Sequence, residues 1–156
     1  MAKRILNQSI EALLNSQVIL YPTDTVWGLG CDATSIDAVA KIFKLKNRVE
    51  SKSLVVLVSS IKMLCSYVHK VPQKAIDIIT TTKKPTTIIY NNPKGLAANA
   101  IASDNTIAIR IPSHDYCLEI INKFGKPIIS TSANISGEST PKSFSEISLP
   151  ILEGVD

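Results

Sequence analysis

The chain has 156 residues, 45% of them hydrophobic and 19% charged, and these figures exclude several classes of protein. The length suffices for one domain with a sizeable buried core, and the hydrophobic content is too high for a disordered chain. The longest apolar runs are of the Leu54 to Val58 kind, whereas a membrane-spanning helix needs about 20 apolar residues. No secretory signal opens the sequence, so we expect a cytoplasmic protein without membrane contact.

The cysteines and the net charge limit the kinds of site and partner that can be expected. Cys31, Cys65 and Cys117 are odd in number and widely spaced, which argues against a disulfide framework or a metal site and favours ordinary buried or half-buried thiols. The net charge of +4 indicates an anionic partner. Phosphate is the first expectation, but net charge does not separate nucleotide, nucleic acid and acidic lipid.

Apolar spacing predicts a helix over residues 5–16 and a short buried strand over 18–21, ended by Pro22. Residues 23–30 are expected to form a loop, because they are too polar and too interrupted by glycine for either element. Ser35 is the expected cap of a second helix. Its buried side is expected to comprise Ile36, Val39, Ala40, Phe43 and Leu45.

The second half of the chain continues the alternation of strands and helices. Strands are expected at residues 54–58, 86–90, 106–111 and 126–130, the first of them central because it is continuously apolar. Helices are expected at 60–69, 73–81 and 115–124. Ser143 and Glu146 have capping-box spacing, which predicts a last helix. The interleaving, without repeat or linker, predicts one α/β domain around a mostly buried sheet.

Three pairs of polar residues are each separated by one position. In an extended segment such residues point to the same side, so each pair forms a two-pronged polar face. Because the first and third pairs follow strands and the second follows a helix, we expect all three to line one crevice at the strand ends. The pairs are Thr23 with Thr25, Lys46 with Arg48, and Ser132 with Asn134.

The basic residues concentrate in residues 41–52, which account for the whole net charge of +4. Lys41 and Lys44 fit a solvated helix face. Lys46, Arg48 and Lys52 fit a polyphosphate site, because arginine offers a planar bidentate fork and lysine a mobile point charge.

Arg110 is a separate candidate, since it shares one face of a predicted strand with Ala108 and needs an anionic or carbonyl partner there. The alternative is a structural salt bridge to Asp32, Asp104 or Asp115.

Several familiar chemistries are missing from the sequence. It contains neither a G-x-x-x-x-G-K-[ST] phosphate loop nor a G-x-G-x-x-G motif. His69 and His114 lack the neighbours of a catalytic triad or metal site, so structural or surface roles are expected. Trp27 is a core residue in one interpretation and a base-stacking residue in the other.

Four stretches, residues 21–33, 42–48, 109–112 and 130–137, closely resemble the YrdC/TsaC family of threonylcarbamoyl-AMP synthases. The resemblance implies a three-layer α/β domain with a mixed twisted sheet around a basic concave cavity. It implies a nucleotidyltransferase that converts L-threonine, bicarbonate or CO₂, and ATP into threonylcarbamoyl-AMP and pyrophosphate. That reaction begins the synthesis of N6-threonylcarbamoyladenosine at position 37 of tRNA.

The resemblance also implies roles for individual residues. The implied catalytic residues are Lys46, Arg48, Ser132 and Asn134. The same four residues, with Lys52, Ser53 and Ser130, would bind ATP, and Mg²⁺ is expected on its phosphates. Threonine would be bound by Thr23, Thr25, Thr87 and Arg110. Proteins that transfer the threonylcarbamoyl group to tRNA are the implied downstream partners.

The sequence departs from the family pattern at Trp27, at Val49 and in the segment 84–87. The single domain over residues 1–156 is expected to lack the family's final C-terminal strand. Two other functions stay open: a non-catalytic module that binds double-stranded RNA or tRNA, and a domain acting on carbamoyl phosphate. The latter is disfavoured, because the domains that accompany it elsewhere are missing from the sequence.

Overall fold

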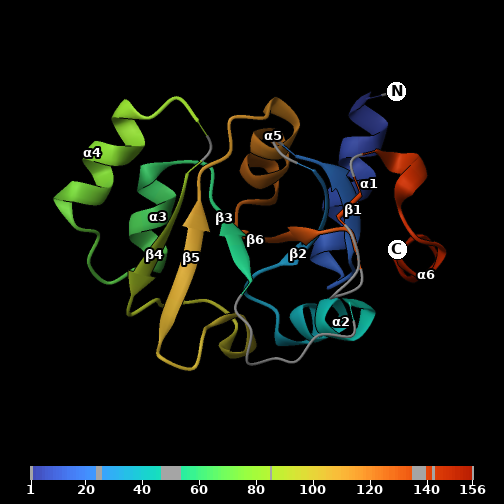
Figure 1. Ribbon diagram of the computed structural model, residues 1–156, viewed down its shortest axis with the longest axis horizontal. Helices are drawn as coiled ribbons and strands as arrows, with labels where there is room; N and C mark the ends of the chain where they lie inside the picture. Colours follow the sequence, from blue (N-terminus) through green and yellow to red (C-terminus); the bar gives the residue numbers. More distant parts are fainter. Residues whose placement is uncertain are drawn as a thin grey trace.

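The computed structural model describes residues 2–23, 26–46, 54–84, 86–134, 140–141 and 143–155. A six-stranded open sheet runs through its centre in the order β1-β2-β6-β3-β5-β4 (Figure 1). The strands are β1 (Ile19–Pro22), β2 (Trp27–Asp32), β3 (Val55–Leu57), β4 (Thr87–Asn91), β5 (Thr106–Arg110) and β6 (Ile128–Ser132). The sheet is mixed, because β3 and β5 pair in parallel while the other pairs of described strands are antiparallel.

Helices lie on both faces of this sheet (Figure 1). They are α1 (Ala2–Leu14), α2 (Ile36–Lys46), α3 (Ile61–Tyr67), α4 (Gln73–Thr81), α5 (Asp115–Phe124) and α6 (Leu149–Gly154), with single 3₁₀ turns η1 (Ala98–Ala100) and η2 (Phe144–Glu146). As predicted, α2 is capped by Ser35, whose Oγ accepts from the Ala38 amide at 3.1 Å. None of the described helices combines the length and apolarity needed to cross a bilayer.

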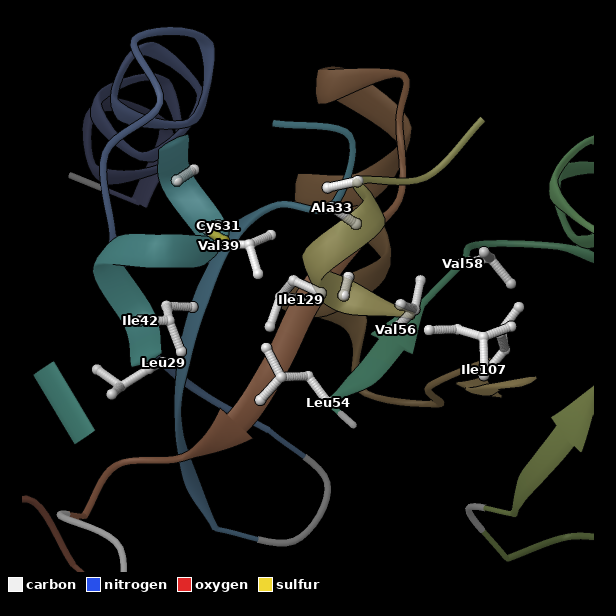
Figure 2. Close-up of a cluster of buried hydrophobic side chains, with 14 of the residues drawn as sticks. Leu29, Cys31, Ala33, Val39, Ile42, Leu54, Val56, Val58, Ile107 and Ile129 are labelled. Atoms are coloured by element: carbon white, nitrogen blue, oxygen red, sulfur yellow. The ribbon is translucent and has the colours of Figure 1, made fainter. Parts of the chain in front are cut away.

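Two separate apolar clusters divide the sheet into what we call the α2 face and the α5 face. On the α2 face, Leu29, Val56 and Ile129 pack with Val39 and Ile42 of α2 (Figure 2). On the α5 face, side chains from β1, β3 and β6 pack with α1 and α5. The members of this second cluster include Leu13, Ile19, Tyr21, Leu57, Ile120, Ile121 and Ile128. The expected three-layer α/β arrangement is confirmed by these two cores.

The prediction of a loop over residues 23–30 was wrong in its second half, because β2 begins at Trp27. This strand pairs with β1 on one side and β6 on the other, and the two ladders outweigh the weak strand propensity of its glycines. The close approach of a neighbouring side chain requires glycine at position 30. A Cβ at this position would lie 2.6 Å from Cε1 of Tyr21, whose ring therefore occupies the space above the glycine.

Three smaller expectations also need correction. Ser143 caps no long helix: its hydroxyl makes no capping hydrogen bond, and the segment forms only the η2 turn before α6 begins at Leu149. Ile36 is exposed rather than buried, because it stands in the first turn of α2, beyond the contact with the sheet. The strand expected at residues 126–130 is β6, which ends two residues later and so includes Ser132.

The different burial of two isoleucines in the sheet predicts unequal losses of stability when each is truncated. Ile129 is fully buried in the central strand β6, whereas Ile89 on the edge strand β4 is 70% exposed. Ile129→Ala should lower the free energy of unfolding by about 2–5 kcal/mol through lost burial and a residual cavity. Ile89→Ala should lower it by no more than about 1 kcal/mol. Urea denaturation measures both, and equal losses would contradict this assignment of the core.

Candidate functional site

Part of the α5 face is not covered by helices and forms the floor of the candidate site. The strand register places Val55, Ala108 and Ile89 side by side on this face. Two residues further along β5, Arg110 lies opposite Thr87 of β4. Val55, Ala108 and Arg110 are half-buried, and Thr87 and Ile89 are exposed. The floor is therefore an accessible, mainly apolar surface of β3, β5 and β4 with one guanidinium at its edge.

Arg110 is not held by a salt bridge within the described chain. Asp32 pairs with Lys126 at 3.9 Å, and Asp104 accepts a hydrogen bond from Thr106 at 2.6 Å. The Nε atom of Arg110 is buried without a hydrogen-bond partner among the described residues. A buried donor without an acceptor is costly, so the guanidinium is suited to an anionic ligand rather than to a structural ion pair.

Lys46 lies at the opposite rim, where α2 ends. Its side chain is 2% exposed, and its ammonium donates to Thr131 Oγ1 at 2.8 Å and to the Ser132 carbonyl at 2.6 Å. A third contact, 3.3 Å long, reaches Ser132 Oγ. The lysine of the K-x-R pair is thus brought against the end of β6, 85 residues further along the chain.

Ser132 and Asn134 form a compact polar turn immediately after β6. The Ser132 hydroxyl donates to Asn134 Oδ1, and the Asn134 amide donates to the Ser132 carbonyl at 2.9 Å. Ser132 is half-buried and Asn134 is buried. The structure therefore places Lys46, Ser132 and Asn134 together, as the sequence predicted.

Thr23 and Ser130 both lie beside Gly28. A Cβ at Gly28 would lie 3.1 Å from the Thr23 methyl and 3.6 Å from Ser130 Oγ, so the missing side chain lets these two residues approach. The Thr23 hydroxyl donates to the Val26 carbonyl and accepts from its amide at 3.2 Å. Thr23 thus closes the turn between β1 and β2, on the same side of the molecule as Ser130.

Some of the predicted site residues lie outside the described part of the chain. They are Thr25, Arg48, Lys52 and Ser53. Their roles stay predictions. The interpretation of Lys41 and Lys44 as a helix face agrees with the structure, because both are exposed and Lys41 donates to the Ser16 carbonyl at 2.9 Å.

A cavity of about 110 Å³ adjoins the Arg110 end of the floor and was not anticipated. It is lined by Ile79, Thr82, Lys83, Lys84, Thr86, Ile111 and Ser113. Thr86 and Ile111 are the chain neighbours of Thr87 and Arg110, and Ile79 and Ile111 pack against the cluster of the α2 face, so this cavity lies beside the strand ends and is separate from the floor. The signal in the sequence was the consecutive Lys83 and Lys84, which add positive charge to the lining of this cavity.

The described residues offer no cluster of three His, Cys, Asp or Glu side chains that could hold a metal ion. Cys31 and Cys117 are buried and Cys65 is exposed, and burial raises the pKa of the Cys31 thiol, which keeps it protonated. Trp27 packs edge-to-face on Phe144 with ring centroids 5.3 Å apart, in agreement with a structural role. The polar groups of the site are therefore an ammonium, a guanidinium, hydroxyls and an amide.

The contacts of Lys46 predict that this residue stabilises the fold as well as the site. Lys46→Met removes a donor that Thr131 Oγ1 and the Ser132 carbonyl share and should lower the free energy of unfolding by about 1–3 kcal/mol. Lys44→Met, two residues earlier and exposed, should change it by less than about 0.5 kcal/mol. Guanidinium denaturation of both variants is the measurement, and an unaffected Lys46→Met protein would contradict the prediction.

Known proteins are similar to this chain in sequence. A threonylcarbamoyl-AMP synthase of Pseudoalteromonas translucida is 36% identical over 145 residues, which is 88% of this chain and 75% of that protein. One from Wigglesworthia glossinidia brevipalpis is 37% identical over 148 residues, which is 92% of this chain and 76% of that protein.

Solved structures match over nearly the whole chain. The structure of P. abyssi Sua5 complexed with L-threonine superposes with a TM-score of 0.91 and 25% identity, covering 100% of this chain. This chain spans 46% of that protein, less than half its length. E. coli YciO gives a TM-score of 0.85 at 25% identity, covering 98% of this chain and 75% of that one. The Sua5/YciO/YrdC family model, described as "Telomere recombination", matches residues 11–156, and the chain belongs to this family.

Proposed function

We propose that the protein is a threonylcarbamoyl-AMP synthase that acts as a nucleotidyltransferase on L-threonine, bicarbonate or CO₂, and ATP. The observation that carries the proposal is the buried Lys46 ammonium bound to Ser132 at one rim of a floor that ends in Arg110, whose Nε has no partner among the described residues. This arrangement offers one cationic site for phosphates and another for a carboxylate. The names of the relatives support the same function, and no observation favours the RNA-binding alternative over it.

The chemistry needs positioning and charge stabilisation more than a covalent nucleophile. The threonine amine captures CO₂ as a carbamate and gives up a proton. A carbamate oxygen then attacks the α-phosphorus of ATP, the bond to the β-phosphate oxygen breaks, and pyrophosphate leaves with its electron pair. Negative charge grows on the pyrophosphate, so fixed cations and hydrogen-bond donors lower the barrier.

The phosphate end of this reaction belongs to the rim around Lys46. Lys46, Ser132 and Asn134 lie together there, and we assign them to the triphosphate together with Arg48. Lys52, Ser53 and Ser130 are proposed as further ATP contacts. Ligand binding requires the Lys46 ammonium to share or exchange its present hydroxyl acceptors, which its long side chain permits.

The amino-acid end belongs to the floor around Arg110. The guanidinium would hold the threonine carboxylate, and Thr87 stands directly opposite it on β4. We assign Thr23 and Thr25 to the same substrate. In this proposal Arg110 binds the carboxylate at one end of the floor and Lys46 binds the phosphates at the other, so that the carbamate forms between them.

Mg²⁺ fits this site as a companion of the nucleotide. It prefers oxygen ligands and commonly relies on substrate phosphates with few protein groups. The described donors suited to it are the neutral oxygens of Ser132 and Asn134. Bound there, the ion would neutralise phosphate charge. Contact with tRNA, transfer proteins that receive the product, and a cytoplasmic location are further proposals of the same function.

Pyrophosphate release from ATP tests the reaction. The wild-type protein should release pyrophosphate only when threonine, bicarbonate and ATP are all present. Arg48→Ala should lower kcat/KM about 100-fold or more, because one charge-stabilising donor is lost. Lys44→Ala is the matched control, a nearby exposed lysine whose loss should leave the rate unchanged. Release that ignores threonine, or an unimpaired Arg48→Ala protein, would overturn the proposal.

Amino-acid selectivity gives a second test. A pocket that hydrogen-bonds the threonine hydroxyl should discriminate against valine by about 10⁴-fold in kcat/KM, because the polar groups would be left unpaired. Serine, which keeps the hydroxyl and lacks one methyl group, should lose only about 10- to 200-fold. Competition among the three amino acids in the pyrophosphate assay measures both ratios, and a preference for valine over serine would contradict the prediction.

A further inference from the structure

Tyr21 is a buried polar residue that the proposed mechanism does not use. It stands on β1, is 1% exposed, and projects onto the α5 face. Its ring lies over Gly30, where a Cβ would come within 2.6 Å of Cε1 and 3.3 Å of Cζ. The aromatic ring is therefore fixed by a close contact with the backbone of β2, and the hydroxyl is fixed with it.

The hydroxyl of Tyr21 has no hydrogen-bond partner with acceptable geometry among the described residues. Burial raises the pKa of Tyr21 well above its usual value, against smaller lowering effects from Arg110 and from the Ser130 hydroxyl, which faces the phenol without meeting hydrogen-bond geometry. The phenol is therefore a neutral donor at physiological pH. An unpaired buried hydroxyl costs stability, and the cost is recovered when a ligand supplies an acceptor.

Tyr21 and Arg110 carry their unpaired donors on the same face of the sheet. Tyr21 lies over Gly30, and the register pairs Gly30 of β2 with Ser130 of β6. The next strand is β3, which lies between β6 and the strand β5 that carries Arg110. The charge of Arg110 lowers the pKa of the phenol, in keeping with their positions on the same face. Tyr21 Oη and Arg110 Nε are thus two buried donors on one face of the sheet that have no acceptor among the described residues.

We propose that Tyr21 is a substrate-binding residue whose hydroxyl donates a hydrogen bond to the amino-acid carboxylate that Arg110 neutralises. The inference rests on the proposed function and deepens it. A carboxylate presents about four acceptor positions and so can accept from a guanidinium and a phenol together. Gly30 gains a role in substrate binding, because any larger residue there would displace the ring that carries the donor.

The variant Tyr21→Phe tests this role, because it removes only the hydroxyl and keeps the ring packed over Gly30. It should raise the KM for threonine about tenfold or more, the loss expected for one hydrogen bond to a charged group. The KM for ATP should stay unchanged. The melting temperature without ligand should stay equal or rise, because an unpaired buried hydroxyl is lost. A lower melting temperature with an unchanged threonine KM would show a structural role and overturn the proposal.

L-Threoninol, which lacks the carboxylate, locates the contact. Calorimetric titration should give wild-type and Tyr21→Phe proteins the same affinity for threoninol, and a tenfold difference for threonine. A penalty that persists with threoninol would place the hydroxyl elsewhere on the substrate and overturn the proposal. Tyr90→Phe is the matched control, since Tyr90 is buried in the cluster on the opposite face and should leave threonine affinity unaltered.

Titration also separates this inference from the proposed function. If the wild-type protein binds threonine but releases no pyrophosphate, the synthase proposal fails, while the comparison of Tyr21→Phe with the wild type still decides the role of Tyr21. If the wild-type protein does not bind threonine, both fail.

Discussion

The ammonium group of Lys46 connects the elements that form the candidate site. Lys46 ends α2 on one face of the sheet and reaches the end of β6, where it binds a hydroxyl, a carbonyl and a second hydroxyl. Taking a cation out of water is costly unless its donors are satisfied, and β6 supplies the acceptors. The position of α2, the end of the central strand and the polar turn after it are therefore fixed by the same group.

The two faces of the sheet differ in how far they are covered: one is packed and the other is partly open. The α2 face is filled with branched apolar side chains and provides much of the core (Figure 2). The α5 face is only partly covered, so half-buried side chains from β3 and β5 remain open to a ligand. A strand such as β5 alternates between the two tasks, with Ile107 and Ile109 in the core and Ala108 and Arg110 on the floor. Rigid packing on one side thus positions the binding groups on the other.

Sequence patterns were sufficient where a local rule sets the structure. The Ser35 cap, the bounds of α5 at residues 115–124 and the grouping of Lys46 with Ser132 followed from spacing, capping and resemblance. The patterns failed at β2, because its glycines are tolerated through pairing on both sides and contact with Tyr21, and both are long-range. The sequence also did not reveal the two buried donors of the α5 face, Tyr21 Oη and Arg110 Nε, that lack partners among the described residues. Whether a buried atom has a hydrogen-bond partner depends on residues that only the folded structure brings together.

The central place of β6 has a consequence for how the protein is made. This strand inserts between β2 and β3, about a hundred residues from its first neighbour in sequence, so the sheet cannot close until residues 128–132 are available. Such distant pairing slows folding, because a long loop must be ordered before its contacts form. During synthesis the earlier strands leave the ribosome with two unfilled edges, which invite pairing with other chains. The late strand both completes the candidate site and covers the edges of β2 and β3 that would otherwise stay open.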